Sequence, residues 1–74
     1  MATAMTQDCV LQIGDMAGVV WKTLDEQGPL SLAKLVKNTG APRDTVMQAL
    51  GWLAREDKVT IEETSRGKIV SLRA

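Results

Sequence analysis

The chain has no histidine, tyrosine or phenylalanine and only one cysteine among its 74 residues. It therefore lacks the usual general bases, activated nucleophiles and metal-binding clusters. The adjacent carboxylates Glu62 and Glu63 do not replace them, because neighbours on a predicted strand point to opposite faces. No glycine-rich phosphate loop follows a strand. The sequence predicts that the protein is not an enzyme and carries no metal or cofactor.

Long apolar runs are also missing. The longest, Met16 to Trp21, is interrupted by Gly18 and is too short to span a bilayer. Residues 1–8 lack the basic region and apolar core of a secretion signal. Because Cys9 has no second cysteine to pair with, no disulfide can form within the chain. These features predict one small domain located in the cytoplasm.

A first helix is predicted after a flexible tail of residues 1–7, with Asp8 as its N-cap and Gln27 near its end. Gly28 and Pro29 then supply a stop signal. The apolar residues at helical spacing, expected to form one buried stripe, are Cys9, Ile13, Ala17, Val20, Trp21 and Leu24.

Two glycines interrupt this first helix. Gly14 and Gly18 are four residues apart, so they lie on one face, and each costs roughly 1 kcal/mol of helix stability relative to alanine. Two explanations remain open at this point. Another part of the same domain packs closely against them, or they mark a helix crossing between two copies of the chain.

Two further helices follow in quick succession. Leu30 is expected to form a short strand, and Ser31 to cap a second helix that ends at Asn38 to Gly40. Pro42 suits the first position of a third helix, which should run to about Glu56. The residues expected to face the core are Leu32, Leu35 and Val36 on the second helix, and Val46, Ala49, Leu50 and Leu53 on the third.

The C-terminal segment alternates apolar and polar residues, which is typical of half-buried strands. Val59 and Ile61 are predicted to face inward on one strand, and Val70 and Leu72 on the next. Gly67 suits a turn position with positive φ, so the strands should pair as a hairpin. Glu63 then lies near Lys68 across the strands, and Arg66 is left at the tip as an unpaired cation.

This order of elements resembles the winged helix-turn-helix superfamily, and the chain is similar to the short bacterial winged-helix proteins of unassigned function. The resemblance is carried by Leu35-Val36 before Gly40, by the run from Val46 to Glu56, and by Lys58-Val59. It implies an α+β fold over residues 8–74, with three helices followed by a two-stranded antiparallel wing. Asp57 departs from the pattern, because such chains often have glycine before the wing.

The nine cations and nine anions cancel, yet they are unevenly distributed. Residues 1–30 hold one cation against four anions, whereas residues 31–55 hold four cations against Asp44 alone. Residues 56–74 hold four of each sign. Net neutrality argues against a protein that neutralises many phosphates, but the basic excess lies on the helix-turn-helix, where contact with DNA requires it.

Two functions from different classes follow. In the first, a small transcriptional regulator binds double-stranded DNA, with its third helix in the major groove and its wing on the backbone. Thr45 and Gln48 are its predicted base contacts. Its predicted phosphate contacts are Lys34, Lys37, Arg43 and Arg66. The alternative for these side chains is an ordinary solvated surface.

In the second function, the chain is a protein-interaction or dimerisation module that does not bind DNA. Met47 and Trp52 lie beside the predicted core stripe of the third helix, so both are expected to be partly exposed. Trp52 either adds burial against the first helix or the wing, or anchors an interface. A homodimer is compatible with both functions.

Overall fold

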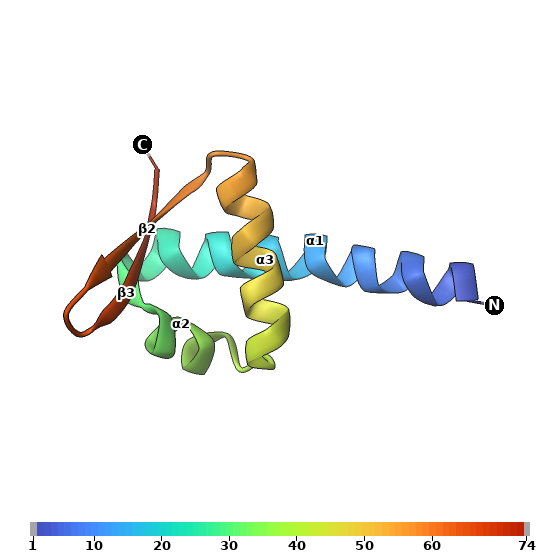
Figure 1. Ribbon diagram of the computed structural model, residues 1–74, viewed down its shortest axis with the longest axis horizontal. Coiled ribbons are helices and arrows are strands. Elements are labelled where there is room, and N and C mark those ends of the chain that lie inside the picture. Colours follow the sequence, from blue (N-terminus) through green and yellow to red (C-terminus); the bar gives the residue numbers. More distant parts are fainter. Residues whose placement is uncertain (1, 74) are drawn as a thin grey trace.

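The computed structural model describes residues 2–73 (Figure 1). In chain order its elements are α1 (Ala2–Gln27), β1 (Leu30–Ser31), α2 (Leu32–Thr39), α3 (Arg43–Arg55), β2 (Val59–Thr64) and β3 (Gly67–Leu72). The three strands form one antiparallel sheet in the order β1-β3-β2. Three helices followed by a two-stranded wing, with a short third strand, confirm the winged helix-turn-helix fold.

Helix α1 begins at Ala2, so the prediction that Asp8 caps its start is wrong. The physical reason is local, because Ala, Met and Gln before Asp8 favour helix and no glycine or proline separates them from Cys9. Met1 lies outside the described residues, and the flexibility expected of residues 1–7 stays a prediction. The predicted end is confirmed: Gly28 has φ 78° and its N–H donates to the Leu24 carbonyl at 2.8 Å.

The helix-turn-helix forms from the predicted local signals. The Ser31 hydroxyl accepts a hydrogen bond from the Lys34 backbone N–H at 3.2 Å, as an N-cap does. Gly40, with φ 69°, ends α2 and donates its N–H to the Lys37 carbonyl. Pro42 is the N-cap of α3 rather than its first helical residue, because its extended backbone lets its carbonyl accept the first helical bond, from Val46.

Helix α3 ends at Arg55 in a Schellman motif. The Asp57 N–H donates to the Ala54 carbonyl at 3.0 Å, and the Lys58 N–H donates to the Leu53 carbonyl at 2.9 Å. Asp57 takes the left-handed conformation, with φ 66°, that glycine usually supplies at this point. The aspartate that departs from the family pattern therefore adopts the backbone conformation typical of the glycine it replaces.

The wing has the predicted register. Glu63 lies opposite Lys68, with 3.6 Å between the carboxylate and the ammonium, and Gly67 has φ 121°. Ile61 differs from expectation, because it is 41% exposed although it lies opposite the buried Val70. Strand β2 is at the edge of the sheet and the wing extends away from the helices, so the inner face is covered only near its base (Figure 1).

The core lies where α1, α2, α3 and the sheet meet. Its buried residues are Ala17, Val20, Leu24, Leu32, Leu35, Val46, Ala49, Leu50, Leu53, Val59 and Val70. The predictions for α2 and α3 are confirmed except at Val36, which packs against the core but is only partly buried. Three predicted members on α1 are not buried: Trp21 is 41% exposed, Cys9 is exposed and Ile13 is half-buried. Trp21 lies at the edge of the α1 stripe, about 100° around the helix from Val20, and Cys9 lies before the region where α1 meets the domain.

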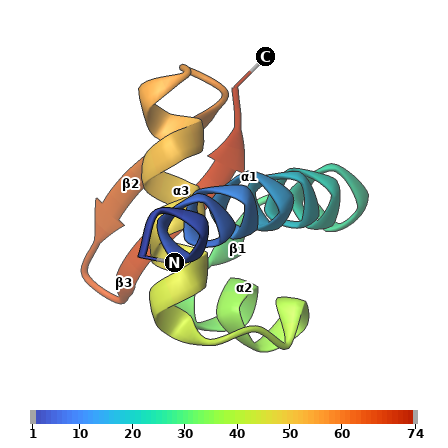
Figure 2. The same ribbon diagram turned by 90° about the vertical axis from the view of Figure 1, so that its right-hand side faces the viewer.

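Helix α1 crosses α3 and then extends beyond the rest of the molecule (Figures 1 and 2). The molecule accordingly measures 44 Å along its longest axis and 23 by 21 Å across. From residue 9 onward, the buried residues of α1 start only at Ala17. No helix within residues 2–73 combines the length and apolar character that crossing a membrane requires.

Candidate nucleic-acid interface

The first turn of α2, the start of α3 and the tip of the wing meet around one basic hollow. Its lining residues are Ser31, Leu32, Ala33, Arg43, Arg66, Gly67 and Lys68. The sheet register explains the meeting, because pairing of Ser31 with Ile69 holds the wing beside the start of α2. Two predicted phosphate contacts, Arg43 and Arg66, thus come together although they are distant in the sequence.

Lys68 is a lining residue that the sequence prediction missed. Its cross-strand pairing with Glu63 was foreseen, and this made it look neutralised. The ammonium and the carboxylate are 3.6 Å apart, and both side chains are well exposed to solvent. Such a surface pair contributes little, so Lys68 remains available to a stronger anion.

Ion pairing divides the cations into two groups. Three pairs occur among the described residues: Lys58 with Glu56, Lys68 with Glu63, and Arg73 with Asp57. None of these pairs includes a cation predicted to contact phosphate, namely Lys34, Lys37, Arg43 or Arg66. The ion pairs found in the described part of the chain therefore leave the four predicted phosphate contacts of the helix-turn-helix and the wing unpaired there.

The two predicted base contacts are placed differently. Gln48 is exposed on α3, as expected. Thr45 is half-buried and lines a separate hollow between α3 and α1, beside Asp15 and Met16. Lys34 and Lys37 are exposed on α2, about one turn apart, and neither lines the hollow of Arg43 and Arg66. The structure thus gathers only part of the predicted site.

Met47 and Trp52, the predicted interaction surface, lie on different sides of α3. Both are partly exposed as predicted, at 42% and 46%. Five residues along a helix turn a side chain by about 140°, so the two point in different directions. Trp52 lines a groove against α1, and Met47 is not among the residues of that groove.

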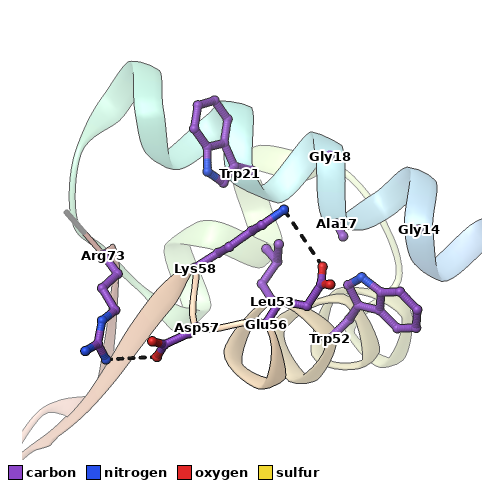
Figure 3. A pocket seen from close by; sticks show the side chains of 10 residues that line it. All are labelled: Gly14, Ala17, Gly18, Trp21, Trp52, Leu53, Glu56, Asp57, Lys58 and Arg73. Atoms are coloured by element: carbon purple, nitrogen blue, oxygen red, sulfur yellow. Dashed lines mark ion pairs between the residues drawn. The ribbon is translucent and has the colours of Figure 1, made fainter.

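The groove that Trp52 lines, called here the tryptophan groove, lies between α1 and the C-terminal end of α3 (Figure 3). It is lined by Gly14, Ala17, Gly18, Trp21, Trp52, Leu53, Glu56, Asp57, Lys58 and Arg73. A Cβ atom built on Gly14 or Gly18 meets nothing within 4 Å. Close packing within the domain therefore does not explain these two glycines.

Acidic side chains and cysteine do not converge on a metal site in the part of the chain that the structure describes. Within residues 2–73 there is no cluster of three or more side chains of histidine, cysteine, aspartate or glutamate that could hold a metal ion.

Comparison with known proteins gives the same fold. The family model described as "Winged helix-turn-helix domain (DUF2582)" matches residues 5–72. The uncharacterized protein MJ1608 of Methanocaldococcus jannaschii is 30% identical over 64 residues, which are 84% of this chain and 91% of that protein.

Two solved structures are similar. The solution NMR structure of protein BT2368 from Bacteroides thetaiotaomicron has a TM-score of 0.75 and 33% identity, covering 82% of this chain and 74% of that one. The crystal structure of the Zalpha domain of Carassius auratus PKZ, in complex with Z-DNA, has a TM-score of 0.74 and 20% identity. That match covers 82% of this chain and 97% of the Zalpha chain, and at this identity it shows a shared fold alone.

Proposed function

Because the chain belongs to the winged helix-turn-helix domain family DUF2582, we propose that it is a small cytoplasmic regulator that binds double-stranded DNA and has no catalytic activity. Helix α3 enters the major groove and the wing contacts the backbone. The observation that carries this proposal is the basic hollow, where Arg43 and Arg66 meet with no ion-pair partner among the described residues.

The hollow is built to hold a phosphate. Two guanidinium groups offer paired donors that match phosphate oxygens. The first turn of α2 borders the same space, and the N-terminal end of a helix carries a partial positive charge. Lys34 and Lys37 on the same helix extend the basic surface toward the next phosphates. These contacts position the protein on a duplex without selecting a sequence.

In this proposal, side chains on the exposed face of α3 contact the edges of the bases. Gln48 is exposed, and its amide matches the hydrogen-bonding edge of adenine. Thr45 faces the hollow beside α1, so it reaches a base only if α1 also approaches the duplex. Asp44, exposed near the start of α3, repels phosphate and restricts how closely this end approaches the backbone.

The first experiment is a fluorescence anisotropy titration of a labelled mixed-sequence duplex at several salt concentrations. Four phosphate contacts predict that log K falls with log salt with a slope of about −3.6. Because the Zalpha domain was solved with Z-DNA, an alternating CG duplex held in the Z form is a second probe. No binding to either duplex at low salt would overturn the proposal.

The double variant R43A/R66A tests the role of the hollow. Loss of two phosphate contacts should reduce the magnitude of the salt slope by about 2 and weaken binding roughly 30-fold at physiological salt. The matched control is Lys22→Ala, which removes an exposed cation from α1 outside the hollow. An unchanged slope in the double variant would remove the hollow from the interface.

A further inference from the structure

The face of α1 that lines the tryptophan groove continues along the helix as an exposed apolar seam. We define the seam as Leu11, Gly14, Gly18 and Trp21, spaced by three, four and three residues. Leu11 is 64% exposed and Trp21 is 41% exposed. Alternating steps of three and four are the spacing by which one helix packs along another. We propose that two copies of this chain associate through this seam as an antiparallel homodimer.

The order of large and small residues in the seam favours a second copy as the occupant. A two-fold interface requires that if one residue contacts another, the reverse contact also occurs. The seam has a large residue at each end and a glycine at each inner position, with spacings of three, four and three residues. This order of sizes and spacings is therefore symmetric about Met16. Leu11 then meets the partner's Trp21, and Gly14 meets the partner's Gly18, each twice.

The two glycines permit the helices to approach closely. Glycine lowers helix stability, and neither Gly14 nor Gly18 is in close contact within one copy. An antiparallel crossing centred on Met16 brings the backbones together at these glycines, while Leu11 and Trp21 fill the wider space beyond them. The dimer supplies the close packing that is missing from the isolated domain.

The projecting half of α1 also needs a partner. Residues 9–16 of α1 contain no fully buried residue. Met16 packs partly against the core, and the N-terminal end of the helix extends beyond the rest of the molecule (Figure 1). A single helical segment of this length is marginal in water. In the antiparallel register it lies along residues 16–23 of the partner, which the partner's own domain supports. The projecting half of α1 in each copy is therefore covered by the part of the partner's α1 that packs on the partner's domain.

The exposed apolar area approaches what a dimer requires. Trp21 and Trp52 border the groove, and each leaves roughly 100 Å² of its surface exposed (Figure 3). Val10, 51% exposed, and Leu11 add similar areas on the projecting half. These four side chains give roughly 400 Å² per copy, about half of a standard interface, before the polar rim of the groove is included.

The dimer leaves the basic hollow accessible. The residues that line the tryptophan groove and those that line the basic hollow have no member in common. Association through α1 therefore does not depend on DNA binding, and the two proposals can fail separately.

Sedimentation velocity over a range of protein concentrations, without DNA, tests the association. Tryptophan fluorescence gives a second signal, because Trp21 and Trp52 are the only tryptophans and the chain has no tyrosine. We expect a concentration-dependent dimer whose emission shifts to the red on dilution, as both rings become more exposed to water. A monomer at millimolar concentration would overturn the proposal.

The double variant G14Q/G18Q tests the seam itself. Glutamine favours helix more than glycine, so each copy should stay folded, which circular dichroism verifies. The longer side chains block close approach, so dimer affinity should fall at least 10-fold. The matched control is Gly51→Gln, an exposed helical glycine on α3 with equally open surroundings, which should dimerise as the natural chain does. Unchanged dimerisation of G14Q/G18Q would exclude the seam.

Helix orientation is tested with a spin label at Glu26→Cys in a Cys9→Ser background. Antiparallel helices centred on Met16 place the two labelled positions about 30 Å apart along the helix axes. Parallel helices bring them close together. A double electron–electron resonance distance near or above 30 Å supports the proposed register, and a short distance overturns it.

Discussion

Asp57 shows how one residue can satisfy a local requirement at an energetic cost. Its φ of 66° completes the Schellman motif at the end of α3, in a conformation that costs most L-residues roughly 1–2 kcal/mol. Aspartate tolerates this conformation better than most side chains, and its carboxylate lies 2.9 Å from the Arg73 guanidinium. Both groups of this ion pair are well exposed, so the pair contributes little.

Backbone conformation should therefore dominate the effect of substitutions at this position. We expect Asp57→Ala to lower the free energy of unfolding by about 1 kcal/mol, and Asp57→Gly to leave it unchanged or slightly raised. Urea denaturation followed by circular dichroism measures the difference. Arg73→Ala is the control for the ion pair and should change stability by less than about 0.5 kcal/mol. Equal stability of the alanine and glycine variants would refute the conformational explanation.

The two tryptophans show the limit of periodicity at the scale of single residues. Helical spacing assigned Trp21 to the core and Trp52 to its edge, yet both line the same groove and are exposed to similar extents. Periodicity gives the direction of a side chain around its own helix. It does not tell how far the neighbouring element extends, which decides whether a residue at the edge of the stripe is covered.

At the scale of elements, α2 depends on its N-cap. It has only eight residues, and the Ser31 hydroxyl satisfies the Lys34 N–H in its first turn. We expect Ser31→Ala to lower the free energy of unfolding by about 1 kcal/mol, because a backbone donor loses its partner. Thermal denaturation measures this loss. Ser31→Thr, which keeps a hydroxyl acceptor, is the control and should lose less; equal losses would show that the cap is not what stabilises α2.

Helix ends were predicted with unequal success for a physical reason. The ends defined by Gly28 and Gly40 were confirmed, because a residue with positive φ stops a helix regardless of its surroundings. The predicted start of α1 was wrong, because several residues before Asp8 also favour helix. A single capping residue does not force the helix to begin at Asp8. Stop signals based on backbone geometry are therefore more reliable than start signals based on side-chain preference.

At the scale of the whole molecule, the location of charge matters more than its sum. The chain is neutral overall, but α1 holds four anions against one cation. Six cations form no ion pair among the described residues, and all of them except Lys22 lie on α2, α3 or the wing tip. At physiological salt, exposed charges separated by more than about 8 Å are largely screened from one another. No acidic residue lines the basic hollow, so we expect the acidic part of α1 to have little effect on a phosphate bound there.

Two charge variants test this separation. D25N/E26Q raises the net charge by two and should change DNA affinity less than about 2-fold at physiological salt. K34Q/K37Q lowers the net charge by two and should weaken binding roughly 30-fold, because two phosphate contacts are lost. Anisotropy titrations at one salt concentration compare the two. Equal and opposite changes in affinity would show that overall charge, rather than the local surface, controls binding.

The sequence by itself determined the order of the elements, the glycine helix ends and turns, the hairpin register and most of the core. These features depend on periodicity and on backbone preferences that act within a few residues. The tertiary structure decided which distant residues meet. It brought Arg43 to Arg66, turned Thr45 toward α1, separated Met47 from Trp52 and left Gly14 and Gly18 uncovered. Such contacts depend on how the helices cross and where each one ends, and local preference does not encode that geometry.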